Sequence, residues 1–273
     1  MGNILEFDIS LPFVLFSVVT LSFFIYQRFS EKMKKLFENR KISVRTAAFM
    51  VILMGVMITV IVFFPGQLIL AFFIALYSIM MFIFSYVALR KWYFSIIPPI
   101  IFVLFYFFNW NLYTFNLFAV IFSVIIITYL GALFSWKTTW IFTSLLTIMD
   151  VIQVFITGFM GESAGKMIEL GLPVAIILPA FPANTSIVLG LGDIFLAGLL
   201  TIQTGLRKGR NIGVLTALSI SISMFVFEIV SLNTDLFNFF PATIVVVVGW
   251  LVNMGIAKLV AKKLNKSGMK QGD

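Results

Sequence analysis

The chain has 273 residues, of which 61% are hydrophobic and only 11% are charged. With a mean hydropathy of +1.11, this composition leaves too little polar surface for a soluble protein and predicts a polytopic membrane protein. The absence of Cys and His excludes disulfides, thiolate or imidazole metal sites and catalysis by those side chains, so we expect no metal and no cofactor. We assign the formal charge of +8 to the membrane surface and expect no nucleic-acid partner.

Apolar runs of about 20 residues predict nine membrane-spanning helices in an all-α bundle. The first six lie within about 11–157, at Leu11–Gln27, Thr46–Phe64, Leu68–Leu89, Tyr93–Asn109, Tyr113–Phe134 and Thr138–Thr157. An outer loop over 158–185 precedes three more spans within about 186–261, at Ser186–Gly205, Ile212–Leu232 and Phe240–Ala261, and a cytoplasmic tail covers 262–273. No segment has the composition of a soluble domain, so we expect 1–273 to form a single transmembrane domain.

The predicted outer loop contains a short apolar run, 172–178, which Pro179 and Pro182 bound. This run is too short to cross a bilayer. It is either a re-entrant or interfacial piece or an edge that pairs with an unwound substrate strand. The second interpretation follows because a peptide bond within a helix is shielded until its backbone hydrogen bonds break.

The basic residues orient the predicted bundle. Of the 19 Lys and Arg residues, every one except Lys166 falls on the same side of a nine-span arrangement. By the positive-inside rule, that side is cytoplasmic, so we expect the N-terminus outside and the C-terminus inside. The expected location is the cell membrane if the source is a prokaryote or an archaeon. The basic loop after the first span is expected to contact anionic lipids.

Two aspartates lie inside apolar spans, Asp150 in the sixth and Asp193 in the seventh. A charged group within a bilayer costs about 3 kcal/mol or more, so a pair of them indicates a functional site. The sixth span runs outward and the seventh runs inward. At 1.5 Å per residue, both aspartates are expected roughly 10 Å below the outer boundary, where they can face each other.

Small and polar side chains surround each aspartate at helical spacing. They are Thr143, Thr147 and Thr157 in the sixth span, and Ser186, Gly190, Ala197, Thr201 and Thr204 in the seventh. Two such faces predict a hydrated seam. Gly190 and Gly192 allow close approach and local unwinding beside Asp193. Gln153 is expected either to form a hydrogen bond in the seam or to pack between helices. For Glu228, near the outer end of the eighth span, we favour a snorkelling position at the outer interface over a catalytic role.

A facing pair of carboxyl groups can share one proton. The ionised partner then deprotonates a water molecule while the protonated partner donates to the scissile carbonyl oxygen. The two groups are expected to titrate as a unit. This is the chemistry of an aspartic peptidase, and it needs neither metal, Cys nor His.

Three sequence features together resemble the presenilin and signal peptide peptidase family of intramembrane aspartyl proteases, the GxGD type. They are Asp150, the quartet Gly190-Leu191-Gly192-Asp193, and Pro241-Ala242-Thr243 at the start of the ninth span. The resemblance implies a nine-span fold, Asp150 and Asp193 as the catalytic pair, and site-shaping roles for Gly190, Leu191, Gly192, Pro241, Ala242 and Thr243.

The specific matches lie in the second half of the chain, and two neighbouring positions depart from the family pattern. Met149 stands where the family usually has Tyr, and Thr243 stands where it usually has Leu. The expected orientation resembles that of the signal peptide peptidase branch. The short chain and tight loops resemble an archaeal member.

The sequence therefore predicts an intramembrane aspartic endopeptidase that cuts single-pass membrane helices, such as signal-peptide remnants or type II anchors. Membrane lipids are its other expected partners, and its oligomeric state is open. A proton- or ion-coupled transporter would use the same aspartates as a relay. A prepilin-type peptidase would act on the cytoplasmic side, and a membrane chaperone would bind helices without needing either acid.

Overall fold

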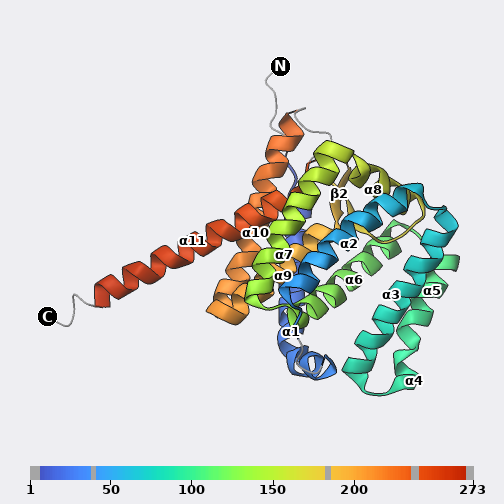
Figure 1. Cartoon of the computed structure of the whole chain (residues 1–273), viewed down its shortest axis with the longest axis horizontal. Coiled ribbons are helices and arrows are strands. Elements are labelled where there is room, and N and C mark those ends of the chain that lie inside the picture. Colours follow the sequence, from blue (N-terminus) through green and yellow to red (C-terminus); the bar gives the residue numbers. More distant parts are fainter. Residues whose placement is uncertain (1–6, 38–40, 182–185, 235–239, 269–273) are drawn as a thin grey trace.

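The computed structural model describes residues 7–37, 41–181, 186–234 and 240–268, which form a helical bundle with one two-stranded hairpin (Figure 1). In chain order the elements are α1 (Ser10–Leu36), α2 (Val44–Phe63), α3 (Gly66–Leu89), α4 (Trp92–Ser95), α5 (Ile97–Phe108), α6 (Leu112–Leu133), α7 (Trp136–Val151), the π-helix η1 (Ile152–Thr157), α8 (Phe159–Glu169), β1 (Ala175–Pro179), β2 (Ser186–Gly190), α9 (Leu191–Lys208), α10 (Arg210–Asn233) and α11 (Ala242–Gly268). Helices α3 to α5 form one flank, and the far part of α11 projects from the opposite side.

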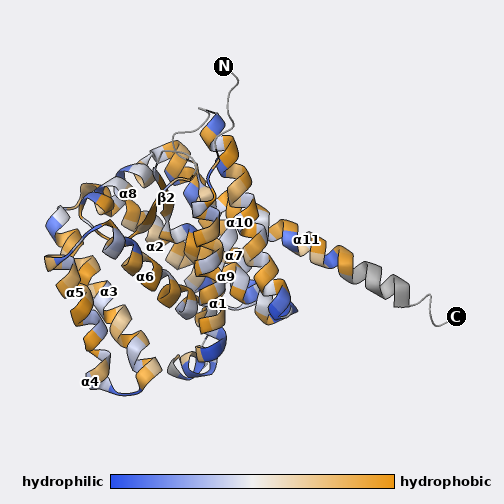
Figure 2. Ribbon diagram, turned by 180° about the vertical axis from the view of Figure 1, so that it is seen from behind, coloured by the Kyte–Doolittle hydropathy of each residue, from blue (hydrophilic) through white to orange (hydrophobic). Residues whose placement is uncertain are grey.

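The chain is a multi-pass membrane protein. Within the described residues, seven helical segments are long and apolar enough to cross a membrane, namely α1, α2, α3, α6, α7 with η1, α10 and α11. Hydrophobic residues dominate the helices, and the most hydrophilic segments lie near helix ends (Figure 2). Two of the nine predicted spans do not meet these limits. The segment Tyr93–Asn109 is divided at Ile96 into α4 and α5, and Ser186–Gly205 begins with a strand.

Polar side chains close several helix ends that would otherwise leave backbone groups unpaired. Ser135 caps the N-terminus of α7 in a capping box with Thr138. At the C-terminal end of α2, the Lys166 ammonium donates to the carbonyl oxygens of Val62 (3.0 Å), in the last turn, and of Phe64 (2.6 Å), which follows the helix. The one basic residue predicted outside thus satisfies carbonyls that α2 leaves exposed.

Helix α9 lies in the middle of the bundle and contacts α1, α6, α7, α10 and α11 (Figure 1). Its neighbours approach closely at glycines. A Cβ atom at Gly198 would lie 2.5 Å from Ile127 of α6, so only glycine fits there. Because α9 is enclosed by protein, it does not need the uniformly apolar surface of a lipid-facing span.

The segment predicted as an outer loop, 158–185, contains helix α8 and strand β1. Strand β1 pairs antiparallel with β2, from Ala175 opposite Gly190 to Pro179 opposite Ser186. The prediction that Ser186–Gly190 starts a helix was wrong. An apolar run this short is compatible with either structure, and the pairing with β1 decides in favour of the strand.

The far edge of β1 is covered by α6. The Asn116 side chain donates to the Ile177 carbonyl oxygen (2.7 Å) and accepts from the Ile177 amide (2.9 Å). This pair of hydrogen bonds occupies the backbone of β1 where a further strand would add. The accessible edge of the hairpin therefore belongs to β2.

The segment before α1 is tied to the end of β1. Asp8 accepts hydrogen bonds from the amides of Leu11 (3.0 Å) and Phe181 (2.6 Å), and the Ile9 amide donates to the Phe181 carbonyl oxygen (2.9 Å). Burial raises the pKa of Asp8, but the hydrogen bonds from Ser10, Phe181 and Leu11 outweigh it and hold this pKa below its ordinary value. These contacts anchor the start of α1 beside the hairpin.

Candidate active site

Asp150 and Asp193 come from different helices and line one cavity of about 640 Å³. Asp150 lies in the last turn of α7 and is 3% exposed, whereas Asp193 lies in the first turn of α9 and is 9% exposed. The two carboxyl groups are close enough to interact electrostatically. The N-terminus of α9 also directs the positive end of its helix dipole toward Asp193. We call this space the aspartate cavity.

Thr243 holds Asp150 in place. Its hydroxyl group donates to Asp150 Oδ2 over 2.6 Å, and both side chains are buried. Pro241 is buried immediately before α11, and Ala242 lines the aspartate cavity. The structure thus brings the Pro241-Ala242-Thr243 segment to Asp150. The Thr243 hydroxyl donates a hydrogen bond that a Leu side chain at this position could not supply.

The two glycines before Asp193 differ in their surroundings. A Cβ atom at Gly190 would lie 3.3 Å from Asp193 Oδ2, whereas a Cβ atom at Gly192 would meet nothing within 4 Å. Both glycines line the aspartate cavity, and Leu191 between them is buried. The chain is extended as far as Gly190 and helical from Leu191, so Asp193 lies in the first turn of α9. Gly190 leaves space that the carboxyl group needs.

Helix α8 forms a large part of the cavity wall, and the sequence interpretation missed it. Met160, Met167 and Ile168 line the cavity from this helix, at spacings that put them on one face. Glu162 adds a third acidic side chain to the wall. The spacing of these apolar residues was the available signal. It was hidden by the polar, glycine-containing composition of the segment.

The small and polar side chains of the predicted seam differ in their surroundings. Gln153 in η1 donates to the Gly55 carbonyl oxygen of α2 (3.3 Å) and accepts a hydrogen bond from the Thr157 hydroxyl (3.1 Å), so it both connects two helices and bonds with a side chain of the predicted seam. Thr204 accepts a hydrogen bond from the Trp250 indole (2.9 Å). Thr143 and Thr201 are buried with no hydrogen-bond partner among the described residues. Ser186 belongs to β2 and not to the helical face of Asp193.

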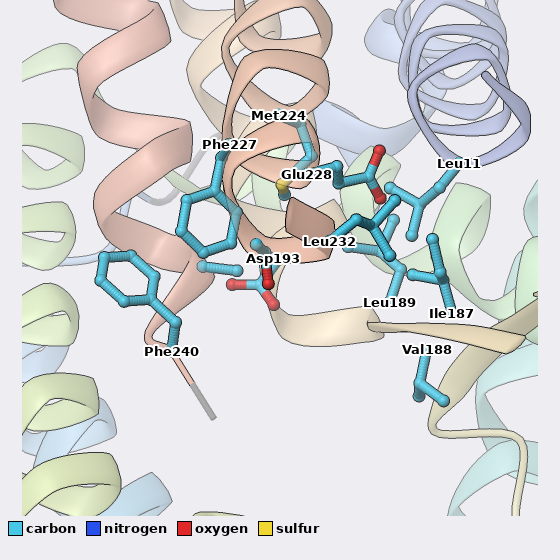
Figure 3. A pocket seen from close by; sticks show the side chains of 12 residues that line it. Leu11, Ile187, Val188, Leu189, Asp193, Met224, Phe227, Glu228, Leu232 and Phe240 are labelled. Atoms are coloured by element: carbon cyan, nitrogen blue, oxygen red, sulfur yellow. The ribbon is translucent and has the colours of Figure 1, made fainter. Parts of the chain in front are cut away.

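The sequence predicts that Glu228 snorkels to the outer interface, but the structure buries this side chain. It is 6% exposed and lines a second pocket, of about 240 Å³, together with Asp193 (Figure 3). Helix α10 continues past Glu228 to Asn233, and residues of this last turn line the pocket together with residues of α1 and β2. We call this space the Glu228 pocket.

In the described ranges, His, Cys, Asp and Glu side chains nowhere gather in a group of three or more that could hold a metal ion. Comparison with models of known protein families gives no match for this sequence, and comparison with curated proteins gives none either. The candidate site is therefore defined by the side chains that surround Asp150 and Asp193.

Proposed function

We propose that the chain is an intramembrane aspartyl protease with Asp150 and Asp193 as its catalytic pair. The observation that carries this proposal is that both carboxyl groups, from separate helices of a membrane protein, line the same cavity. Buried carboxyl groups in an apolar span are costly, and a pair facing one space is suited to sharing a proton. The motif resemblance described above points to the same two residues.

The proposed mechanism uses one ionised and one protonated aspartate. The ionised group takes a proton from a water molecule while the oxygen of that water bonds to the scissile carbonyl carbon. The protonated group donates its proton to the carbonyl oxygen. Proton transfer to the amide nitrogen then breaks the C–N bond and releases an amine and a carboxylic acid. The hydrogen bond from Thr243 fixes the orientation of Asp150, as catalysis by positioned groups requires.

The expected substrates are single-pass membrane helices that unwind locally at the cavity. The cavity wall is mostly apolar, which suits a membrane segment. Val188 on β2 lines the cavity, and β1 is already occupied by Asn116 on its other side. An unwound substrate strand that adds to β2 would bring its peptide bonds beside Asp193, just beyond the end of this strand.

The catalytic test replaces each aspartate by asparagine, which keeps the size but cannot share the proton. Purified Asp150→Asn and Asp193→Asn proteins should each lose about 1,000-fold or more of the cleavage rate on a model membrane helix, measured by mass spectrometry of the products. The double variant should lose little more, because the two groups act as one unit. Glu31→Gln, at an exposed position on α1, is the matched control.

Appreciable cleavage by either single variant would overturn the catalytic pair. Peptide products from the wild-type protein also separate a protease from a proton-coupled transporter, which would yield uptake and no products.

We further propose nine membrane spans with the N-terminus outside. The two additional spans are Trp92–Phe108 and α9, whose 18 residues extend about 27 Å at 1.5 Å per residue. In this Cys-free chain, Asn233→Cys should react with an impermeant thiol reagent added to intact cells. Lys137→Cys, also exposed, should react only after permeabilisation. The reverse labelling pattern would invert the proposed orientation.

A further inference from the structure

Glu228 is a buried acidic side chain that the proposed catalytic pair does not use. It is 6% exposed, and neither carboxyl oxygen has a hydrogen-bond partner among the described residues. A carboxyl group removed from water is normally compensated by hydrogen bonds or an opposite charge. The described part of this chain supplies a hydrogen bond to neither oxygen of the Glu228 carboxyl group. This lack points to a group that a ligand brings.

The Glu228 pocket has space for such a group. Its wall includes Leu11 of α1, Ile187 and Leu189 of β2, and Met224 of α10. In Figure 3 the carboxyl group of Glu228 is directed toward Leu11, whereas Asp193 lies on the side of the pocket nearer Phe240. At about 240 Å³, the pocket holds one long side chain but not a helix.

The Glu228 pocket adjoins the aspartate cavity. Val188, Asp193, Phe240 and Ala242 line both spaces. A peptide bound across Asp193 in an extended conformation therefore occupies the aspartate cavity on one side and meets the Glu228 pocket on the other. A side chain a few residues from the scissile bond would be the part that reaches Glu228.

The charge of the pocket selects a cation. Among the described residues that line it, the polar side chains are Asp193, Glu228 and Ser231, and none is basic. Asp8 adds a nearby negative charge that acts on Glu228, and its own oxygens are already engaged by the amides of Leu11 and Phe181. A positive group entering this apolar, acidic space would meet no competing cation among these described lining residues.

We propose that the Glu228 pocket is a subsite for a lysine or arginine side chain of the peptide cut at the catalytic pair. The carbon chain of that residue packs against Leu11 and Met224, and its terminal cation pairs with the Glu228 carboxylate. This assignment rests on the proposed protease function. It makes Glu228 a specificity-determining residue, distinct from the two aspartates that perform the chemistry.

The test compares model membrane helices that carry either lysine or norleucine at one position, scanned over the residues on both sides of the cleavage point. The two side chains share their carbon chain and differ in the ammonium group. All peptides are N-acetylated, and one peptide with a free amino terminus shows whether an α-ammonium is accepted as well. At one position the wild-type protein should prefer lysine by about tenfold or more in kcat/KM.

The variant Glu228→Gln should bring this ratio close to one, because the amide keeps the shape but loses the charge. Glu31→Gln, which changes an exposed Glu on α1, should keep the wild-type ratio. Loss of the ratio in both variants would contradict the assignment. Equal cleavage of both peptides at every position by the wild-type protein would overturn the subsite while the protease stands, and this result does not depend on folding of any variant.

Absence of cleavage of every peptide would instead count against the protease itself. The subsite is then decided by binding, with Kd values of labelled lysine and norleucine peptides measured on the wild-type protein in detergent. Tighter binding of a lysine peptide that Glu228→Gln removes would support the cation site. Equal Kd values for the two peptides would reject it.

Discussion

The aspartate cavity and the Glu228 pocket meet at Asp193, yet the acidic groups that line them differ in their hydrogen bonding. In the larger cavity, Asp150 accepts a hydrogen bond from Thr243, and its charge acts on Asp193. In the smaller pocket, Glu228 has no hydrogen-bond partner among the described residues. The protein's own side chain supplies the hydrogen bond in the first space, which agrees with the catalytic role that we propose for it. In the second space that partner is left to a ligand, which agrees with the proposed recognition of a substrate side chain.

The difference has an energetic side. An unsatisfied buried polar group costs about 1–3 kcal/mol, so Glu228 weakens the fold unless a ligand pairs with it. The Thr243 hydroxyl removes part of this cost for Asp150 by donating to Oδ2 over 2.6 Å. A residue that breaks the rules of folding at one point, next to a proposed catalytic group, is expected where function has taken precedence.

A substitution at Ala242 should disturb the aspartate cavity and the Glu228 pocket at once, because this residue lines both spaces. Ala242→Leu places a bulky side chain at the start of α11, next to the Thr243 that holds Asp150. We expect cleavage of a model helix to fall about 100-fold, since small misplacements of catalytic groups have effects of this size. Initial rates on the purified protein measure the effect.

Ala257→Leu is the matched control, in the same helix but outside both spaces. It should keep cleavage near the wild-type rate. An equal loss in the two variants would mean that α11 tolerates no added bulk anywhere, and the special role of Ala242 would be wrong.

A methyl group at Gly190 should disturb the aspartate cavity and leave the Glu228 pocket unchanged, because of the two spaces this residue lines only the aspartate cavity. The new Cβ atom would lie 3.3 Å from Asp193 Oδ2 and would push the carboxyl group from its position. We expect Gly190→Ala to lower kcat/KM about tenfold on lysine and norleucine peptides alike, because it disturbs positioning and not recognition.

Gly165→Ala controls for the loss of a glycine, since its Cβ atom would meet nothing within 4 Å and Gly165 lines neither space. It should leave cleavage unchanged. A change in the lysine preference of Gly190→Ala, with the rate preserved, would show that the two spaces do not divide chemistry and recognition as proposed.

Local sequence was sufficient to predict the membrane class and the helices of the long apolar runs, and it singled out Asp150 and Asp193, which line one cavity. The seven long apolar helices fall on segments where hydropathy alone predicts a span, because solvation by lipid acts on each segment separately. The two aspartates were visible for the same reason. A carboxyl group is conspicuous in any window that is otherwise apolar.

The tertiary structure decided the rest, because the deciding contacts join residues far apart in the chain. Ser186–Gly190 is a strand only because Ala175–Pro179 lies beside it, and its hydropathy is equally suited to a helix. Thr243 reaches Asp150 across 93 positions of sequence. Glu228 had the pattern of an interfacial residue, yet it is buried at a pocket that residues of α1 and β2 help to line. Burial and pairing depend on neighbours that no local window contains.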